Sequence, residues 1–275
     1  MKTLLIKTHE VWLETLMAAF MSQTTSRQTL YEFSGILWRH LTWLEHELIR
    51  HNEAYDYDRD TIPVKVTHLR DILHNITTRL SEIDLQLIGC PDKALANRIA
   101  SDIRYMQGVL IHMPDETITA FDTSRTLNGV ELTQEATDAL TLFLFEESYK
   151  EYELIMIYNY LQARSDDTFI NRIFQIMIDE SFFHLRSFGQ MMSDMGILGV
   201  PRVIHKSLYQ VESVEQFLRD GIEEEIAAKQ QCLDLSNAVA RESKELAAFF
   251  DFINFQEDYH VSLMREALEH YSKLT

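Results

Sequence analysis

One pattern of acidic residues and histidine occurs twice in this sequence, and both copies lie in its C-terminal half. In each copy a Glu is followed after the same interval by a second Glu and soon afterwards by a His: Glu147, Glu180 and His184, then Glu224, Glu257 and His260. Residues three or four positions apart lie on the same face of an α-helix. The pattern therefore predicts two helical hairpins that turn carboxylates and imidazoles toward a shared core.

The rest of the sequence also favours helices, because it is poor in residues that interrupt them. Only 8 Gly and 4 Pro occur among 275 residues, and 46% of the residues are hydrophobic. Such a chain is long enough for two cores, and we predict an all-α fold. The expected helices span residues 8–21, 30–52, 64–88, 94–112, 134–163, 169–195, 214–240 and 244–272.

A polar stretch without helical periodicity divides the chain. It contains Pro114 and the Asn128-Gly129 dipeptide, which favour turns. We therefore predict two helical bundles joined by a linker, with these boundaries: 1–113 for the N-terminal bundle, 114–133 for the linker and 134–275 for the C-terminal bundle.

Within the C-terminal half, residues 193–213 form a long connection between two tight hairpins. This segment carries Gly196, Gly199 and Pro201, which do not favour a continuous helix. Two hairpins joined by one long crossover between the second and third helices is the topology of a ferritin-like four-helix bundle.

Charge and cysteine content narrow the classes of function. The net charge of −18 argues against a nucleic-acid partner and against an anionic membrane surface. No apolar run is long enough to span a membrane, and the first residues lack the pattern of a signal peptide. Two distant cysteines, Cys90 and Cys232, indicate no disulfide framework. We expect a cytoplasmic protein, and a homodimer is one assembly that the sequence leaves open.

The residue types in the repeated pattern suit a metal centre. An acidic side chain within an apolar helical stripe, such as Glu147 beside Leu140, Phe143 and Leu144, is costly to bury unless it is paired or binds a cation. Carboxylate and imidazole ligands without thiolates suit iron or manganese, with zinc as a further option. Glu225 competes with Glu224, because three consecutive Glu residues occupy positions 223–225.

The segment from Glu147 to His260 resembles the ferritin-like diiron carboxylate superfamily, especially its rubrerythrin and bacterioferritin branches. Those proteins carry Glu, Glu-x-x-His, Glu and Glu-x-x-His on four successive helices. The resemblance covers residues 134–275 and implies two divalent ions, an oxidoreductase that uses O₂ or peroxide, and a small substrate that the sequence does not identify. It implies six metal ligands: Glu147, Glu180, His184, Glu224, Glu257 and His260.

The chain departs from the family pattern in one half-site. Glu180 and His184 are separated by one residue more than the family spacing, and Ser181 stands where the family has Glu. The family also often carries a Tyr seven residues after the first Glu. Tyr158 has that relation to Glu151 rather than to Glu147, which makes Glu151 an alternative ligand. Two alternatives stay open: an iron-handling protein without an organic substrate and, because of this departure, a metal-free helical scaffold that binds a partner.

The N-terminal half repeats the spacing of the first copy in Glu14, Glu47 and His51. If the chain turns near Thr25, Glu47 lies twice as far from the turn along the sequence as Glu14 does. At about 1.5 Å of rise per residue the two side chains would differ in level by about 16 Å. We therefore expect no working metal site in that half.

Overall fold

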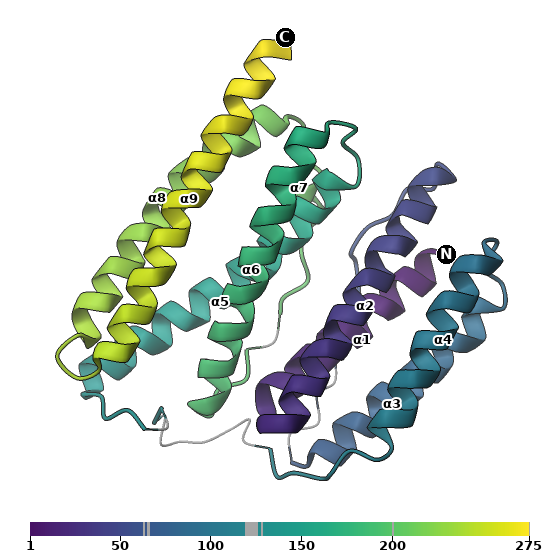
Figure 1. Ribbon diagram of the computed structural model, residues 1–275, viewed down its shortest axis with the longest axis horizontal. Helices are drawn as coiled ribbons and strands as arrows, with labels where there is room; N and C mark the ends of the chain where they lie inside the picture. Colours follow the sequence, from purple (N-terminus) through teal and green to yellow (C-terminus); the bar gives the residue numbers. More distant parts are fainter. Residues whose placement is uncertain (63, 65–66, 119–125, 128, 200, 275) are drawn as a thin grey trace. The chain divides into compact units, whose positions relative to one another are not determined.

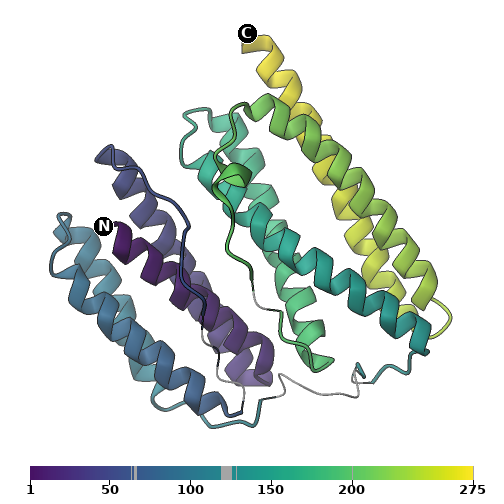
Figure 2. The same cartoon turned by 180° about the vertical axis from the view of Figure 1, so that it is seen from behind.

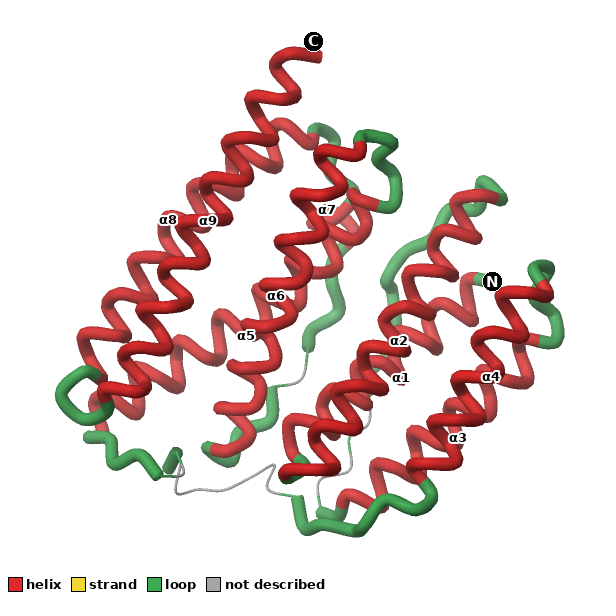
Figure 3. The backbone as a smooth tube through the Cα atoms, viewed as in Figure 1, coloured by secondary structure: helices red, strands yellow, loops and turns green. Residues whose placement is uncertain are grey.

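The computed structural model describes residues 1–62, 64, 67–118, 126–127, 129–199 and 201–274, and this part of the chain contains nine helices and no strand (Figures 1 and 3). The all-α prediction is confirmed. The helices are α1 (Lys2–Met21), α2 (Thr24–Arg50), α3 (Leu69–Leu87), α4 (Lys93–Leu110), α5 (Gln134–Gln162), α6 (Thr168–Asp194), α7 (Lys206–Tyr209), α8 (Val214–Val239) and α9 (Lys244–Leu274).

The chain divides into two compact units. The first comprises Met1–Asp122 and Gly196–Ile204, and the second comprises Thr123–Met195 and His205–Thr275. Part of the segment expected as a crossover thus groups with the first unit. Of the expected linker over 114–133, residues 119–125 and 128 lie outside the described residues.

In the first unit α1 packs against α2 and α3, and α4 packs against the same two helices (Figures 1 and 2). Helix α1 is buried on all sides from Val11 to Met21. A helix that is apolar around its whole circumference has to lie inside the protein. The segment after α2 adds to its cover, because the ring of Tyr57 lies 5.8 Å from that of His9.

Helix α2 begins at Thr24, earlier than the sequence predicts. The polar composition of residues 22–29 predicts a break between two helices there, but only Ser22 and Gln23 lie outside both. The carboxylate of Glu116 accepts a hydrogen bond from the backbone N–H of Gln23 at 2.8 Å and another from the Ser26 hydroxyl. An anionic acceptor at a helix N-terminus stabilises the free N–H groups there. The partner is distant in the sequence, so local propensity could not reveal this start.

In the second unit each of the four long helices packs against two neighbours, which makes a helical bundle. Helices α5 and α6 form one hairpin and α8 and α9 form the other, while α5 contacts α8 and α6 contacts α9. Short α7, which the sequence did not predict, packs against α5, where the rings of Tyr160 and Tyr209 lie 4.8 Å apart. All four long helices can therefore contribute side chains to one interior.

None of the described helices combines the length and the hydropathy that crossing a lipid bilayer requires.

Candidate metal centre

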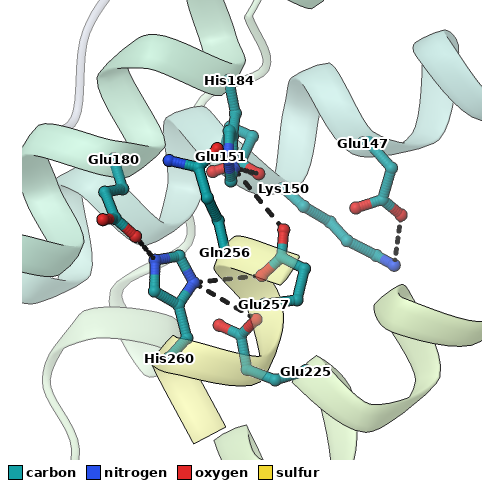
Figure 4. A network of polar contacts seen from close by, with 9 residues as sticks. All are labelled: Glu147, Lys150, Glu151, Glu180, His184, Glu225, Gln256, Glu257 and His260. Carbon is teal, nitrogen blue, oxygen red and sulfur yellow. Dashed lines mark hydrogen bonds and ion pairs between the residues drawn. The ribbon is translucent and has the colours of Figure 1, made fainter. Parts of the chain in front are cut away.

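The interior of the second unit holds three carboxylates and two histidines in two groups that share one residue (Figure 4). In each group the ligand atoms lie within 4.8 Å of one another, and every member is buried. The His184 cluster consists of Glu151, His184 and Glu257. The His260 cluster consists of Glu225, Glu257 and His260.

The His184 cluster is built from three helices. Nδ1 of His184 on α6 lies 2.9 Å from Oε1 of Glu151 on α5 and 3.5 Å from Oε1 of Glu257 on α9. On the other side of the ring, Nε2 lies 3.2 Å from Oε1 of Gln256. The imidazole therefore turns one nitrogen toward the carboxylates and the other toward a neutral amide.

The His260 cluster repeats this geometry. Nδ1 of His260 on α9 lies 3.0 Å from Oε2 of Glu257 and 3.5 Å from Oε2 of Glu225 on α8. Its Nε2 lies 2.8 Å from Oε2 of Glu180 on α6, a distance that makes an ion pair although the N–H direction does not suit a hydrogen bond. Glu257 turns Oε1 toward one histidine and Oε2 toward the other, so it links the two clusters.

Helix geometry explains why these residues meet. Side chains on a helix lean toward its N-terminus. In a hairpin the side chains of the first helix therefore lean away from the turn, and those of the second lean toward it. Glu151 is nearer to the end of α5 than His184 is to the start of α6, and their side chains meet. Glu225 is likewise nearer to the end of α8 than His260 is to the start of α9.

Aromatic side chains enclose the polar interior. The ring of Phe188 stacks on His184 at 5.8 Å, and Phe143 contacts Phe188 and Phe250 at 5.5 and 5.2 Å. Farther along α5, Tyr158 stacks on Phe174 at 5.7 Å. Apolar rings on these sides keep water away and make electrostatic interactions within the clusters stronger than they would be in solvent.

The carboxylates determine the protonation of both histidines. Burial alone would lower the pKa of His184, but the charges of Glu151 and Glu257 raise it to about 9. Burial also works against charge on His260, yet contacts with Glu180, Glu225 and Glu257 raise its pKa well above the usual range. Protons on the two imidazoles therefore offset the charge of the surrounding carboxylates.

The two carboxylates around His260 respond in opposite directions. Burial raises the pKa of Glu257 to about 8, and the hydrogen bond with Glu225 adds to this rise. Burial would also raise the pKa of Glu225, but hydrogen bonds from Glu257 and His260 lower it. The two neighbouring carboxylates therefore differ in proton affinity, and Glu257 is the one whose ionised form is disfavoured.

The donor set fits a pair of divalent cations. Oε2 of Glu151 and the hydroxyl of Tyr158 are buried and have no hydrogen-bond partner among the described residues. A buried oxygen without a partner is costly, and a cation beside Glu151 would satisfy it. Burial and the surrounding carboxylates raise the pKa of Cys232 far above its usual range, which leaves imidazole and carboxylate as the ligand types. Iron, manganese and zinc all accept such ligands.

The structure brings together three of the six residues selected from the sequence pattern: His184, Glu257 and His260. Glu180 contacts His260 from outside the clusters. Glu224 is exposed on α8, one position from the buried Glu225.

Glu147 is buried one helical turn from Glu151, but its partner is not a histidine. The ammonium of Lys150 donates a hydrogen bond to Oε1 of Glu147 at 2.8 Å. Burial raises the pKa of Glu147 to about 7, and Lys150 offsets part of this rise. Glu147 therefore belongs to an ion pair beside the clusters rather than to either of them.

The direction in which helical side chains lean would have favoured Glu151 over Glu147 from the sequence alone. Glu147 is farther from the α5–α6 turn than Glu180 is, which is the reverse of what the lean requires for a contact. The pair Glu151 and His184 meets this requirement, because Glu151 is nearer to the turn than His184 is. The equal spacing of the two copies carries no information about this direction, since Glu151 and His184 are separated by the same interval as Glu147 and Glu180.

The residues of the first unit with the same spacing do not gather. Glu14 is fully buried on α1 and pairs with Arg79, whose Nε lies 3.2 Å from Oε2 of the acid. Glu47 pairs instead with Arg50 and with His51, whose Nε2 lies 2.9 Å from its Oε1. Among the residues that the structure describes, no group in this unit matches the two clusters.

Comparisons of the chain with protein-family models, with curated proteins and with solved structures found no match. The functional interpretation consequently depends on the geometry of the two clusters.

Proposed function

We propose that the second unit is a ferritin-like bundle that binds two divalent metal ions, with iron best suited, and that the protein is an oxidoreductase using O₂ or peroxide. The observation that carries the proposal is the position of Glu257. Its two carboxylate oxygens face two different histidines, at 3.5 and 3.0 Å. A carboxylate that presents one oxygen to each of two buried Glu–His pairs has the form of a bridging ligand in a carboxylate dimetal bundle.

The residues divide into two half-sites. Glu151 and His184 would hold one ion, Glu225 and His260 would hold the other, and Glu257 would bridge them. Each imidazole would give up the proton on Nδ1, because a metal ligand has to present a lone pair. The protons that balance the carboxylates in the metal-free protein would then be replaced by the charges of the ions.

The order of these residues along the chain supports a ferritin-like arrangement. The first hairpin supplies Glu151 and His184, and the second supplies Glu225, Glu257 and His260. Two hairpins and a long connection between the second and third long helices are the features that this class of bundle combines.

Bound iron would supply the redox chemistry with O₂ or peroxide. The chain itself contributes enclosure and orientation. Phe188 covers one face of the His184 ring, and the ring centroids of His184 and His260 are held 6.0 Å apart. Because all five ligands are buried and come from long helices, little reorganisation is required when cations enter.

Metal content of the full-length chain purified without chelator tests the proposal, followed by anaerobic Fe(II) titration and exposure to air. We expect close to two ions per chain and a near-ultraviolet absorption band after oxidation. A folded protein that binds no iron, manganese or zinc would overturn the proposal and leave a helical scaffold.

Matched variants test the ligand assignment. Glu151→Gln and Glu225→Gln should each reduce the bound metal to one ion per chain or less. Glu147→Gln and Glu224→Gln lie on the same two helices and should keep both ions. If instead Glu147→Gln and Glu224→Gln lose metal while the other two variants keep it, the ligand set chosen from the sequence spacing is the correct one.

Oxygen consumption by the iron-loaded protein separates an enzyme from an iron-handling protein. Uptake that continues beyond the Fe(II) supplied when a small organic substrate is added supports an oxidase or oxygenase. Uptake that stops once the added Fe(II) is oxidised, for every substrate offered, would support iron handling instead.

A further inference from the structure

Each histidine of the two clusters is held from outside by a residue on the helix that carries the other histidine (Figure 4). His184 on α6 contacts Gln256 on α9 through Nε2, and His260 on α9 contacts Glu180 on α6 through Nε2. In both rings Nδ1 is the nitrogen that faces the carboxylates of its own cluster. In both rings Nε2 therefore faces outward, toward Gln256 or Glu180, and Nδ1 faces inward.

The two outer partners differ in charge although they have almost the same shape. Gln256 offers a neutral amide oxygen at 3.2 Å, whereas Glu180 offers a carboxylate oxygen at 2.8 Å. A carboxylate close to the outer nitrogen of a ligating histidine favours positive charge on the ring and makes the inner nitrogen a stronger donor, and a neutral amide does so less. The carboxylate also adds a negative charge close to the incoming cation.

From this asymmetry we infer that the two half-sites are unequal, an inference that rests on the proposed dimetal function. The His260 cluster binds a divalent cation first and more tightly. Glu180 and Gln256 are the positioning residues that set this order. Neither residue is itself a ligand. Glu180, which the sequence pattern selected as a ligand, acts through His260 instead.

The position of Glu180 explains the unusual spacing on α6. In the family pattern that the chain resembles, the acid lies three residues before the histidine and binds the metal itself. Here Ser181 occupies that position and Glu180 lies four residues before His184. The acid contacts His260 on the neighbouring helix α9 and supports that histidine from outside the cluster.

The test uses Co²⁺ as the probe, titrated anaerobically into the metal-free full-length chain and followed by calorimetry and by the visible absorption of the bound ion. Two backgrounds isolate the half-sites: Glu151→Gln disables the His184 cluster, and Glu225→Gln disables the His260 cluster. We expect the isolated His260 cluster to bind Co²⁺ roughly 10-fold or more tightly than the isolated His184 cluster.

The two supports can then be exchanged by isosteric substitutions. Glu180→Gln should weaken the isolated His260 cluster by roughly 10–100-fold and leave the isolated His184 cluster unchanged. Gln256→Glu should tighten the isolated His184 cluster by about 10-fold. A gain in affinity is a result that damage to the fold cannot produce, and the chain that carries both exchanges should fill its half-sites in reverse order.

Two different failures can be told apart. If the wild-type chain binds two Co²⁺ ions but both exchanges change the affinities by less than about twofold, this inference is wrong and the dimetal proposal stands. If the wild-type chain binds no Co²⁺ at all, the dimetal proposal fails and the inference fails with it.

Discussion

Glu14 in the first unit and Glu151 in the second unit are both buried, and they are neutralised in different ways. In the first unit Glu14 is paired with Arg79, whose guanidinium also lies 2.8 Å from Glu10. In the second unit Glu151 is paired with His184 at 2.9 Å. Arginine keeps its protons at every pH that a protein tolerates and has no lone pair to offer, whereas histidine can give up a proton and bind a cation. A buried carboxylate paired with arginine is therefore structural, whereas one paired with a buried histidine can share a cation with it.

The largest expected effect comes from removing the carboxylate shared by the two clusters. Glu257→Gln keeps the size of the side chain but removes the bridging charge. We expect metal content to fall from close to two ions per chain to less than one, measured by elemental analysis after equilibration with Fe(II). Glu47→Gln in the first unit is the control and should change nothing. Equal metal content in wild type and Glu257→Gln would contradict the role of Glu257 as a shared ligand.

Removing the arginine of the first unit should unfold it more easily. Arg79→Met leaves Glu14 fully buried without its cation, and breaking a buried pair in this way costs roughly 3–5 kcal/mol. Chemical denaturation at pH 8 measures the effect. The matched control is Arg70→Met, which breaks a solvent-exposed ion pair with Asp115 at 3.2 Å and should cost less than about 1 kcal/mol. Equal losses for the two variants would mean that burial does not govern this pair.

The acid of the first unit should make stability depend on pH. Burial raises the pKa of Glu14 to about 7 from 4.5, and Arg79 offsets part of the rise. A carboxyl group with a raised pKa binds its proton more tightly in the folded chain, so its contribution is complete below about pH 4.5 and is lost as the pH rises through about 7.

The Glu14→Gln variant isolates that contribution. We expect the wild type to lose stability relative to the variant between about pH 4.5 and 7, by on the order of 3 kcal/mol. The free energy of unfolding of both proteins, measured at several pH values across this interval, gives the difference. Parallel curves would show that Glu14 stays ionised in the folded chain.

The smallest effect concerns how helices begin. Within the described residues, α1, α2 and α3 have no side-chain N-cap, whereas α4, α5, α6 and α8 each have one. At the start of α9 the Ser243 hydroxyl accepts a hydrogen bond from Leu246 N–H at 3.1 Å. Ser243→Ala should cost about 1 kcal/mol by thermal unfolding. Ser262→Ala on the exposed side of α9 should stay within about 0.5 kcal/mol. A larger loss for Ser262 would contradict the capping role.

The sequence predicts the helices well because their signals are local. Sparse Gly and Pro and apolar periodicity identify eight of the nine described helices within a few residues at most ends. The starts of α1 and α2 are the largest errors, and each helix begins six residues before the expected position. At α2 the cause is Glu116, which is distant in the sequence and supplies the hydrogen bonds. Short α7 depends on its packing against α5 rather than on a pattern of its own.

The site was predictable in composition but only partly in identity. Spacing selected His184, Glu257 and His260, which the structure gathers, because each side chain points inward from a long helix. Choosing Glu151 over Glu147 required the direction in which side chains lean, and choosing Glu225 over Glu224 required the rotation of α8. A run of three consecutive Glu residues does not fix that rotation. The outer contacts of Glu180 and Gln256 depend on the distance between α6 and α9, which no spacing within one helix encodes.

The distribution of the clusters over the two hairpins has a consequence for how the second unit assembles. Glu225, Glu257 and His260 all belong to the α8–α9 hairpin, whereas Glu151 and His184 meet Glu257 only across the boundary between hairpins. Contacts that are close in sequence form with a smaller loss of chain entropy than distant ones. We therefore expect the His260 cluster to form while the hairpins are still separate and the His184 cluster to form last, so that a cation captured early would act as a template on which the rest of the unit folds.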